Sequence, residues 1–117
     1  MPLRTRRVHE DASPDDGFRL LTMRFWPRGV RKDRVDAWEK ELGPSPRLLG
    51  KYRNGDVDWP EFERLYRSEM EAKGDLLDRW ARRARDETVT LLCGCRDAAL
   101  CHRTILASLL EERISSI

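Results

Sequence analysis

The chain has 117 residues, of which 39% are hydrophobic and 38% are charged. A chain of this length forms one domain with its own core, so we expect a single domain over residues 1–117. Lys plus Arg number 23 and Asp plus Glu number 21, which leaves a net charge of only +2. This balance argues against a dedicated nucleic-acid binder, whose field is strongly basic, and it predicts a surface dense in ion pairs.

The sequence shows no signal for export or for membrane insertion. No stretch approaches the roughly 18 apolar residues of a membrane-spanning helix. The basic segment at residues 1–7 is followed by no apolar run, which a secretory signal would need. The three cysteines are too few, and odd in number, for a disulfide framework. These features predict a cytoplasmic protein with reduced thiols and no membrane partner.

Two strands are expected in the first quarter of the chain. Residues 4–9 form a weak strand, and residues 10–17, which hold three Asp with Ser, Pro and Gly, form a loop. Residues 18–26 are mostly apolar, as in a strand that is covered on both faces, and they end at Pro27.

Helical patterns dominate the middle of the chain. Residues 33–42 carry an apolar stripe behind a capping Asp, and residues 45–55 run from a capping Ser to an Asn-Gly pair. The helical spacing continues from Asp58 to Ala84, and Gly74 kinks this segment or divides it into two helices. Oppositely charged (i, i+4) pairs along it indicate a solvated face.

The chain ends with a second strong strand over residues 88–93, a turn over residues 94–99 and a last helix over residues 100–113, which Asp97 is placed to cap. Strong apolar strands separated by helices predict parallel pairing. We therefore expect an α/β fold: a small two-layer or three-layer domain in which helices pack on a mostly parallel sheet.

Two chemically unusual clusters follow the two strong strands. Residues 24–29 are Arg-Phe-Trp-Pro-Arg-Gly, whereas residues 93–96 are Cys-Gly-Cys-Arg and residues 101–103 are Cys-His-Arg. In parallel α/β sheets, ligands bind beyond the carboxyl ends of the strands. We therefore expect both clusters to lie on one rim of the sheet.

In the first cluster, Arg24 lies near the end of an apolar strand and needs either a carboxylate or a bound anion as its partner. Arg28 follows the turn and is expected to face a ligand or solvent. Trp26 fits a core position better than a stacking platform.

In the second cluster, Cys101 falls in the first turn of a helix, where free amides and the helix dipole lower the pKa of a thiol. His102 and Arg103 are cations at a helix N-terminus, where an anion is electrostatically favoured. Each residue alone is compatible with a structural role, but the three together indicate a site. Cys101 is expected to be the most reactive thiol, with Cys95 as its rival.

A structural zinc site is a minor alternative. Cys93, Cys95, Cys101 and His102 supply four ligands within ten residues. The spacing is unlike the usual zinc knuckles, and adjacent residues on a helix point about 100° apart. Free thiols and no cofactor are therefore the main expectation.

The chain resembles the family called domain of unknown function 488, in its YeaO-like branch. The resemblance rests on residues 24–30, Trp38, residues 41–45, residues 62–70 and residues 89–92, in the same order over nearly the whole chain. It implies a small α/β domain with a Trp-Pro-Arg-Gly turn after an early strand. The biochemical role of that family is not established.

The end of the chain departs from the YeaO-like branch and resembles the Cys-His-Arg ending of other branches. Because the branches differ at Cys101, a thiol nucleophile is no requirement of the whole family. The motif positions carried over are Arg24, Trp26, Pro27, Arg28, Gly29, Pro44, Ser45, Tyr66, Glu69, Cys93, Cys101, His102 and Arg103.

Together these features favour a basic pocket that binds a compact anion, such as a phosphate-bearing or nucleotide-like ligand. The alternative is a non-catalytic module that docks on nucleic acid or on a regulatory protein; the sequence does not decide whether the chain is an enzyme. Glu69 is expected to pair with Arg24 or Arg28. The catalytic candidates are Cys101 and His102, and the ligand-binding candidates are Arg24, Trp26, Arg28, Tyr66, Glu69 and Arg103.

Overall fold

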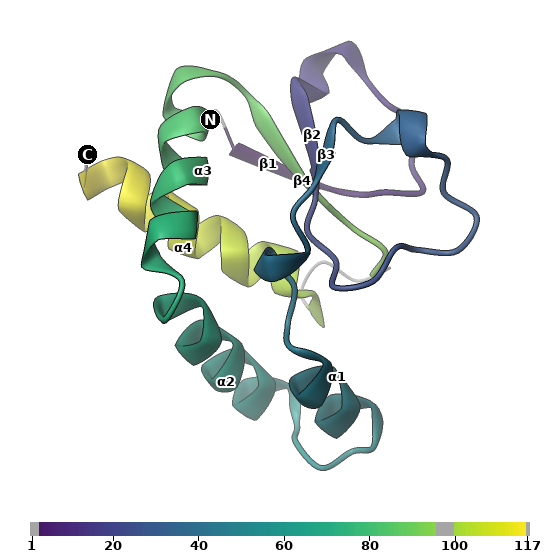
Figure 1. The fold of residues 1–117 in the computed structure, drawn as a ribbon, viewed down its shortest axis with the longest axis vertical. Helices are drawn as coiled ribbons and strands as arrows, with labels where there is room; N and C mark the ends of the chain where they lie inside the picture. The colour runs from purple at the N-terminus through teal and green to yellow at the C-terminus, as the bar shows by residue number, and fades with distance from the viewer. Residues whose placement is uncertain (1–2, 96–99, 117) are drawn as a thin grey trace.

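The computed structural model describes residues 3–95 and 100–116 (Figure 1). A four-stranded, fully parallel sheet has the strand order β1-β4-β2-β3. The predicted α/β fold is therefore confirmed. Among the described residues, no helix combines the length and the apolar character that crossing a membrane requires. The elements are β1 (Leu3–Arg7), β2 (Phe18–Leu21), β3 (Ala37–Trp38), β4 (Val89–Cys93), α1 (Pro46–Arg53), α2 (Trp59–Glu71), α3 (Gly74–Asp86) and α4 (His102–Ser116).

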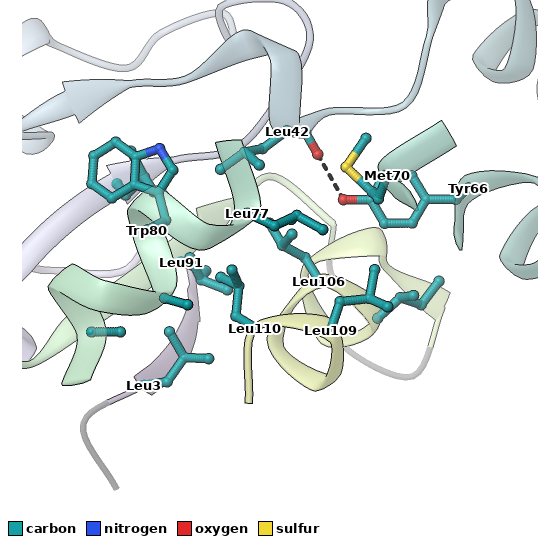
Figure 2. Packing of buried hydrophobic residues seen from close by; sticks show 14 of the residues in the cluster. Leu3, Leu42, Tyr66, Met70, Leu77, Trp80, Leu91, Leu106, Leu109 and Leu110 are labelled. Atoms are coloured by element: carbon teal, nitrogen blue, oxygen red, sulfur yellow. Dashed lines mark hydrogen bonds between the residues drawn. The ribbon is translucent and has the colours of Figure 1, made fainter. Parts of the chain in front are cut away.

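One face of the sheet is covered by helices. Figure 1 shows α3 and α4 on one side of the strands, and α4 packs against both β1 and β4. Side chains alternate along a strand, so Leu20 and Leu91, which are register partners, both join the core on the helix side. Figure 2 shows this core, in which Leu77 of α3 and Leu106 of α4 meet the sheet.

Among residues 3–95 and 100–116, no α-helix covers the opposite face of the sheet, so the two-layer form of the prediction holds there. Leu21 and Leu92 point to this side and form a second apolar cluster with Val8. The connection between β2 and β3 covers them with Met23, Trp26, Val30 and Val35. β4 lies between both clusters, and all of its residues are buried.

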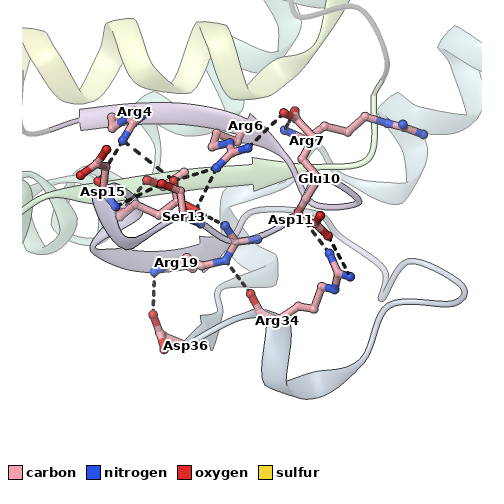
Figure 3. Close-up of polar contacts among 12 residues, drawn as sticks. Arg4, Arg6, Arg7, Glu10, Asp11, Ser13, Asp15, Arg19, Arg34 and Asp36 are labelled. Carbon is pink, nitrogen blue, oxygen red and sulfur yellow. Dashed lines mark hydrogen bonds and ion pairs between the residues drawn. The ribbon is translucent and has the colours of Figure 1, made fainter.

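The same face carries a polar network toward the amino end of β2 (Figure 3). The buried carboxylate of Asp16 accepts hydrogen bonds from Arg6 Nη1 at 3.0 Å, from the Ser13 backbone N–H at 3.0 Å and from Arg19 Nη1. Arg19 also donates from Nε to the Arg34 carbonyl at 2.7 Å. Burial on its own would raise the pKa of Asp16, but the hydrogen bonds from Ser13, Arg6 and Arg19 lower it overall.

The helix predicted over residues 33–42 is wrong. The segment forms two short 3-10 turns on either side of β3. Asp36 donates its backbone N–H to the Arg19 carbonyl of β2 at 2.8 Å, and its side-chain carboxylate accepts the Arg19 N–H at 2.8 Å. Pairing with a distant strand therefore replaces the local helical hydrogen bonds, which the apolar spacing alone does not reveal.

The strand predicted over residues 18–26 is shorter than expected and ends at Leu21. Thr22 still donates its N–H to the Leu92 carbonyl at 3.0 Å, and then the chain turns away. A Cβ at Gly43 would lie 2.5 Å from the backbone nitrogen of Arg24, so only glycine permits this close approach.

The helix starts follow their caps. The hydroxyl of Ser45 accepts the Leu48 N–H at the start of α1, and Asp58 accepts the Glu61 N–H at the start of α2. Gly74 begins α3, which confirms the division of the long helical segment. The expected turn over residues 94–99 lies partly outside the described residues, and the expected Asp97 cap lies wholly outside them.

Candidate functional site

Three thiols meet where β4 ends and α4 begins. Cys93 is the last residue of β4, Cys95 follows two positions later, and Cys101 directly precedes α4. Their three Sγ atoms all lie within 4.8 Å of one another, and those of Cys93 and Cys95 are 3.6 Å apart. Cys93 and Cys101 are buried, whereas Cys95 is half-buried. We call these three residues, together with His102, the thiol cluster.

The His102 ring is fixed between the thiols and β2. Its Nε2 lies 2.8 Å from the Thr22 carbonyl oxygen, and its Nδ1 lies 3.8 Å from Cys93 Sγ. A carbonyl oxygen only accepts hydrogen bonds, so Nε2 carries the proton and Nδ1 presents its lone pair to Cys93. Burial lowers the pKa of His102 and keeps the ring neutral. The ring also packs edge-on against Tyr66, with centroids 5.5 Å apart.

Arg103 ties the end of β4 to the start of α4. Its Nη1 donates to the Cys93 carbonyl at 3.4 Å and to the Cys95 carbonyl at 3.0 Å. The side chain is buried, and its Nε has no hydrogen-bond partner within the described part of the chain. A guanidinium is always charged, so a positive charge stands beside the three thiols.

The thiols differ in acidity. Hydrogen bonds from Cys101 and Cys93, and the nearby charge of Arg103, lower the pKa of Cys95. The pKa of Cys93 is raised by its hydrogen bonds to Cys101 and Cys95 and by burial. The bond from Cys93 favours the Cys101 thiolate, but Cys95 and burial outweigh it and raise the pKa of Cys101 to about 11.

These findings count against the expectation that Cys101 is the most reactive thiol. Cys101 is 1% exposed, whereas Cys95 is only half-buried and holds the lower pKa. The helix N-terminus that the sequence indicates is present, but neighbouring thiols and burial decide the order of acidity. A catalytic role for Cys101 and His102 stays a prediction.

The first cluster of the sequence is used largely for structure. Arg24 pairs with Glu41 at 2.7 Å and donates to the carbonyls of Gly43 and Pro44, so its partner is a carboxylate. Trp26 donates its indole N–H to a backbone carbonyl at 2.9 Å and packs edge-on against Trp38 on the second face.

Arg28 is exposed in the turn.

Tyr66 and Glu69 both lie on α2, but they contact two different parts of the molecule. Tyr66 is fully buried beside His102 and donates to the Leu42 carbonyl at 2.6 Å. Glu69 accepts the Ser45 N–H at 2.9 Å and the Ser45 hydroxyl at 2.5 Å. The expected pairing of Glu69 with Arg24 or Arg28 is therefore wrong, because the carboxylate holds the start of α1 instead.

A pocket of about 120 Å³ lies beside the cluster, between α2 and α4. Sequence reasoning missed Arg67 there, because its (i, i+4) pairing with Glu63 suggests a solvated surface. Arg67 lies next to Tyr66 and within residues 62–70, a stretch that carries the family resemblance, and these are the signals that could have linked it to the site. The pocket is lined by Trp59, Glu63, Arg67, Cys101, Thr104, Ile105 and Ser108.

Comparison with known proteins identifies the family. The sequence profile described as "DUF488-N3a: Active DUF488-N3 subclade" matches residues 3–114. The chain belongs to this family. It is 37% identical over 113 residues to the uncharacterized protein Rv3073c of Mycobacterium tuberculosis H37Rv, covering 95% of each chain. It is 32% identical over 114 residues to the uncharacterized protein YeaO of Escherichia coli K12, covering 96% of this chain and 99% of YeaO.

No solved structure gives a significant match. The resemblance that the sequence suggested is thus confirmed at the level of the family. The relatives are uncharacterized proteins, so they assign no activity.

Proposed function

We propose that this chain binds a compact anion of phosphate size in the pocket between α2 and α4. The observation that carries the proposal is the convergence of Arg67 with Thr104 and Ser108 in a pocket of about 120 Å³. The pocket lies at the first turns of α4, where the positive end of the helix dipole favours an anion.

Arg67 is the positively charged group that would hold the anion. Its Nε donates to Glu63 at 3.1 Å, and a guanidinium has four further N–H donors in a planar fork that suits oxyanions. Both side chains are partly exposed, at 35% and 38%, so the pocket opens to solvent. Glu63 favours a ligand that carries a hydroxyl donor as well as a phosphate, because a carboxylate only accepts hydrogen bonds.

The proposed ligand is still a compact anion at the start of α4, as the sequence indicated. The arginine that binds it is Arg67 rather than Arg24. Arg24 is engaged with Glu41 and two carbonyls, whereas Arg67 borders the pocket itself. Arg103, in the first turn of α4, does not line this pocket, because it is buried and donates to the carbonyls of Cys93 and Cys95.

The alternative, docking through basic helix faces, has less support. A docking surface for nucleic acid needs an uninterrupted positive stripe. The helical arginines instead alternate with acids, since Arg64 pairs with Glu61, Arg83 with Glu87 and Arg113 with Asp78. Docking on nucleic acid or a regulatory protein stays a prediction.

The test is calorimetric titration of the chain with inorganic phosphate and with a hydroxylated phosphate monoester, glycerol phosphate. Arg67→Gln should weaken both about tenfold or more, since a charged hydrogen bond is worth about 1.5–3 kcal/mol. Arg64→Gln is the matched control, because Arg64 lies on the same helix and pairs with Glu61. Equal affinities in wild type and Arg67→Gln, or no binding in wild type, would contradict the proposal.

A further inference from the structure

The thiol cluster has the dimensions of a metal site. A tetrahedral zinc ion with metal–sulfur bonds of about 2.3 Å places its sulfur ligands roughly 3.8 Å apart. Cys93 and Cys95 already meet this spacing at 3.6 Å, and all three sulfurs fall within 4.8 Å. Contraction of the remaining separations by about 1 Å or less completes the three-sulfur face.

The His102 ring is oriented toward the cluster as a fourth ligand, but only the three sulfurs lie within 4.8 Å of one another, so its Nδ1 must move closer to the cluster when a metal binds. In zinc sites the coordinating histidine usually donates its other ring N–H to a carbonyl or carboxylate, which fixes the tautomer. Here the Thr22 carbonyl takes that role at 2.8 Å, and the free Nδ1 lies 3.8 Å from Cys93 Sγ. Without metal, this lone pair can accept the Cys93 S–H. When Cys93 loses its proton to bind a metal, the same lone pair is left facing the metal.

The sequence spacing of the four residues, which is unlike that of zinc knuckles, does not prevent zinc binding in this fold. Adjacent residues diverge by about 100° only when both lie on a helix. Cys101 precedes α4, and His102 is its first residue, so the helix does not force the two side chains apart. Cys93 and Cys95 likewise lie at a strand end, where the chain leaves the regular alternation.

Charge balance favours the same conclusion. One Zn²⁺ with three thiolates and a neutral imidazole carries a net charge of −1, which is costly to bury alone. Arg103 supplies the opposite charge and fixes the carbonyls of Cys93 and Cys95 at the same time.

We propose that Cys93, Cys95, Cys101 and His102 bind one Zn²⁺ ion, which joins the carboxyl end of β4 to the start of α4. Binding releases the protons that the thiols still hold and forms three metal–sulfur bonds and one metal–nitrogen bond. The role is structural, because four protein ligands leave no open position. This site is independent of the anion pocket, although Cys101 borders both.

The test is to load the reduced, full-length chain with Zn²⁺ or Co²⁺. We expect one equivalent of zinc by elemental analysis, and cobalt spectra with thiolate charge-transfer bands and intense tetrahedral ligand-field bands. Cys95→Ser should abolish the wild-type cobalt spectrum, and because Cys95 is half-buried the variant should keep its circular dichroism. His102→Gln should retain the charge-transfer bands with altered ligand-field bands.

His9→Gln is the matched control, since His9 is the other of the two histidines in the chain, and it should leave the spectrum unchanged. Substoichiometric zinc without thiolate charge transfer, or a wild-type spectrum in Cys95→Ser, would overturn the site. Neither result depends on phosphate binding, so this proposal and the anion pocket can fail separately.

Discussion

The molecule holds two polar clusters of opposite character, the Asp16 network near the amino end of β2 and the thiol cluster at the carboxyl end of β4. In the first, every named charge has an opposite charge or a carbonyl within reach. In the second, Arg103 has only carbonyl partners among the described residues and stands beside three thiols and a neutral imidazole. The difference teaches that a cluster saturated with opposite charge stabilises the fold, whereas a buried arginine beside thiols, with no carboxylate partner among the described residues, marks a site.

Removing the central carboxylate should have the largest effect on this comparison. Asp16→Asn leaves buried Arg19 without its ion-pair partner, which typically costs about 3–5 kcal/mol. Urea unfolding measures the loss, and the exposed neighbour variant Asp15→Asn should change stability by less than about 0.5 kcal/mol. A loss at Asp16 as small as that at Asp15 would break the distinction between the two clusters.

Metal removal should have the next largest effect. If zinc binds the folded chain at about a hundred to a thousand times its dissociation constant, it stabilises that chain by about 2.7–4.1 kcal/mol. Chelation should therefore lower the melting temperature of the wild type and leave Cys95→Ser unchanged. An equal response of both proteins to the chelator would show that the cluster contributes no metal-linked stability.

Acid should weaken the first cluster within a defined range of pH. Because the pKa of Asp16 is lowered in the folded state, its contribution is complete above the pKa of about 3.9 of an unfolded Asp. That contribution is lost as the pH falls through the lower, folded pKa. Urea unfolding between pH 5 and pH 2.5, as a rough range, should show a steeper decline for wild type than for Asp16→Asn. Parallel declines would exclude Asp16 as the source.

Arg24 should behave as a member of a saturated network and show the smallest effect. Arg24→Gln removes hydrogen bonds to the carbonyls of Gly43 and Pro44 and an ion pair to half-exposed Glu41. We expect a loss of about 1 kcal/mol in thermal or urea unfolding, with phosphate affinity unchanged. A large loss of phosphate affinity with unchanged stability would instead show that Arg24 binds the ligand.

Local chemistry made much of the fold predictable. Ser45, Asp58 and Gly74 mark helix starts that the structure places at the same residues, because capping acts within a few residues. The region around β3 was not predictable in this way. There, the bonds between Asp36 and Arg19 join segments 17 residues apart, and they override the helical spacing.

The candidate site likewise has a part that local sequence predicts and a part that depends on long-range packing. Cys101 and His102 stand out in the sequence because they are adjacent and begin a helix. The approach of Cys93 and Cys95 to them, and of Arg67 to the pocket, depends on the packing of β4 and α2 against α4. The pairing of Glu69 with Ser45 likewise depends on how α1 meets α2, so the sequence suggested the wrong partner.

The most direct test of the central claim is to follow the backbone amides of the isotopically labelled, reduced chain by NMR while Zn²⁺ and then phosphate are added. The account predicts that zinc perturbs amides of residues 91–95 and 101–104, and that phosphate perturbs those of residues 63–67 and 104–108. Amides of residues 13–19, in the Asp16 network, should stay unchanged. Perturbations centred on residues 13–19, or none beside the thiols and Arg67, would contradict the assignment of function to the carboxyl end of β4.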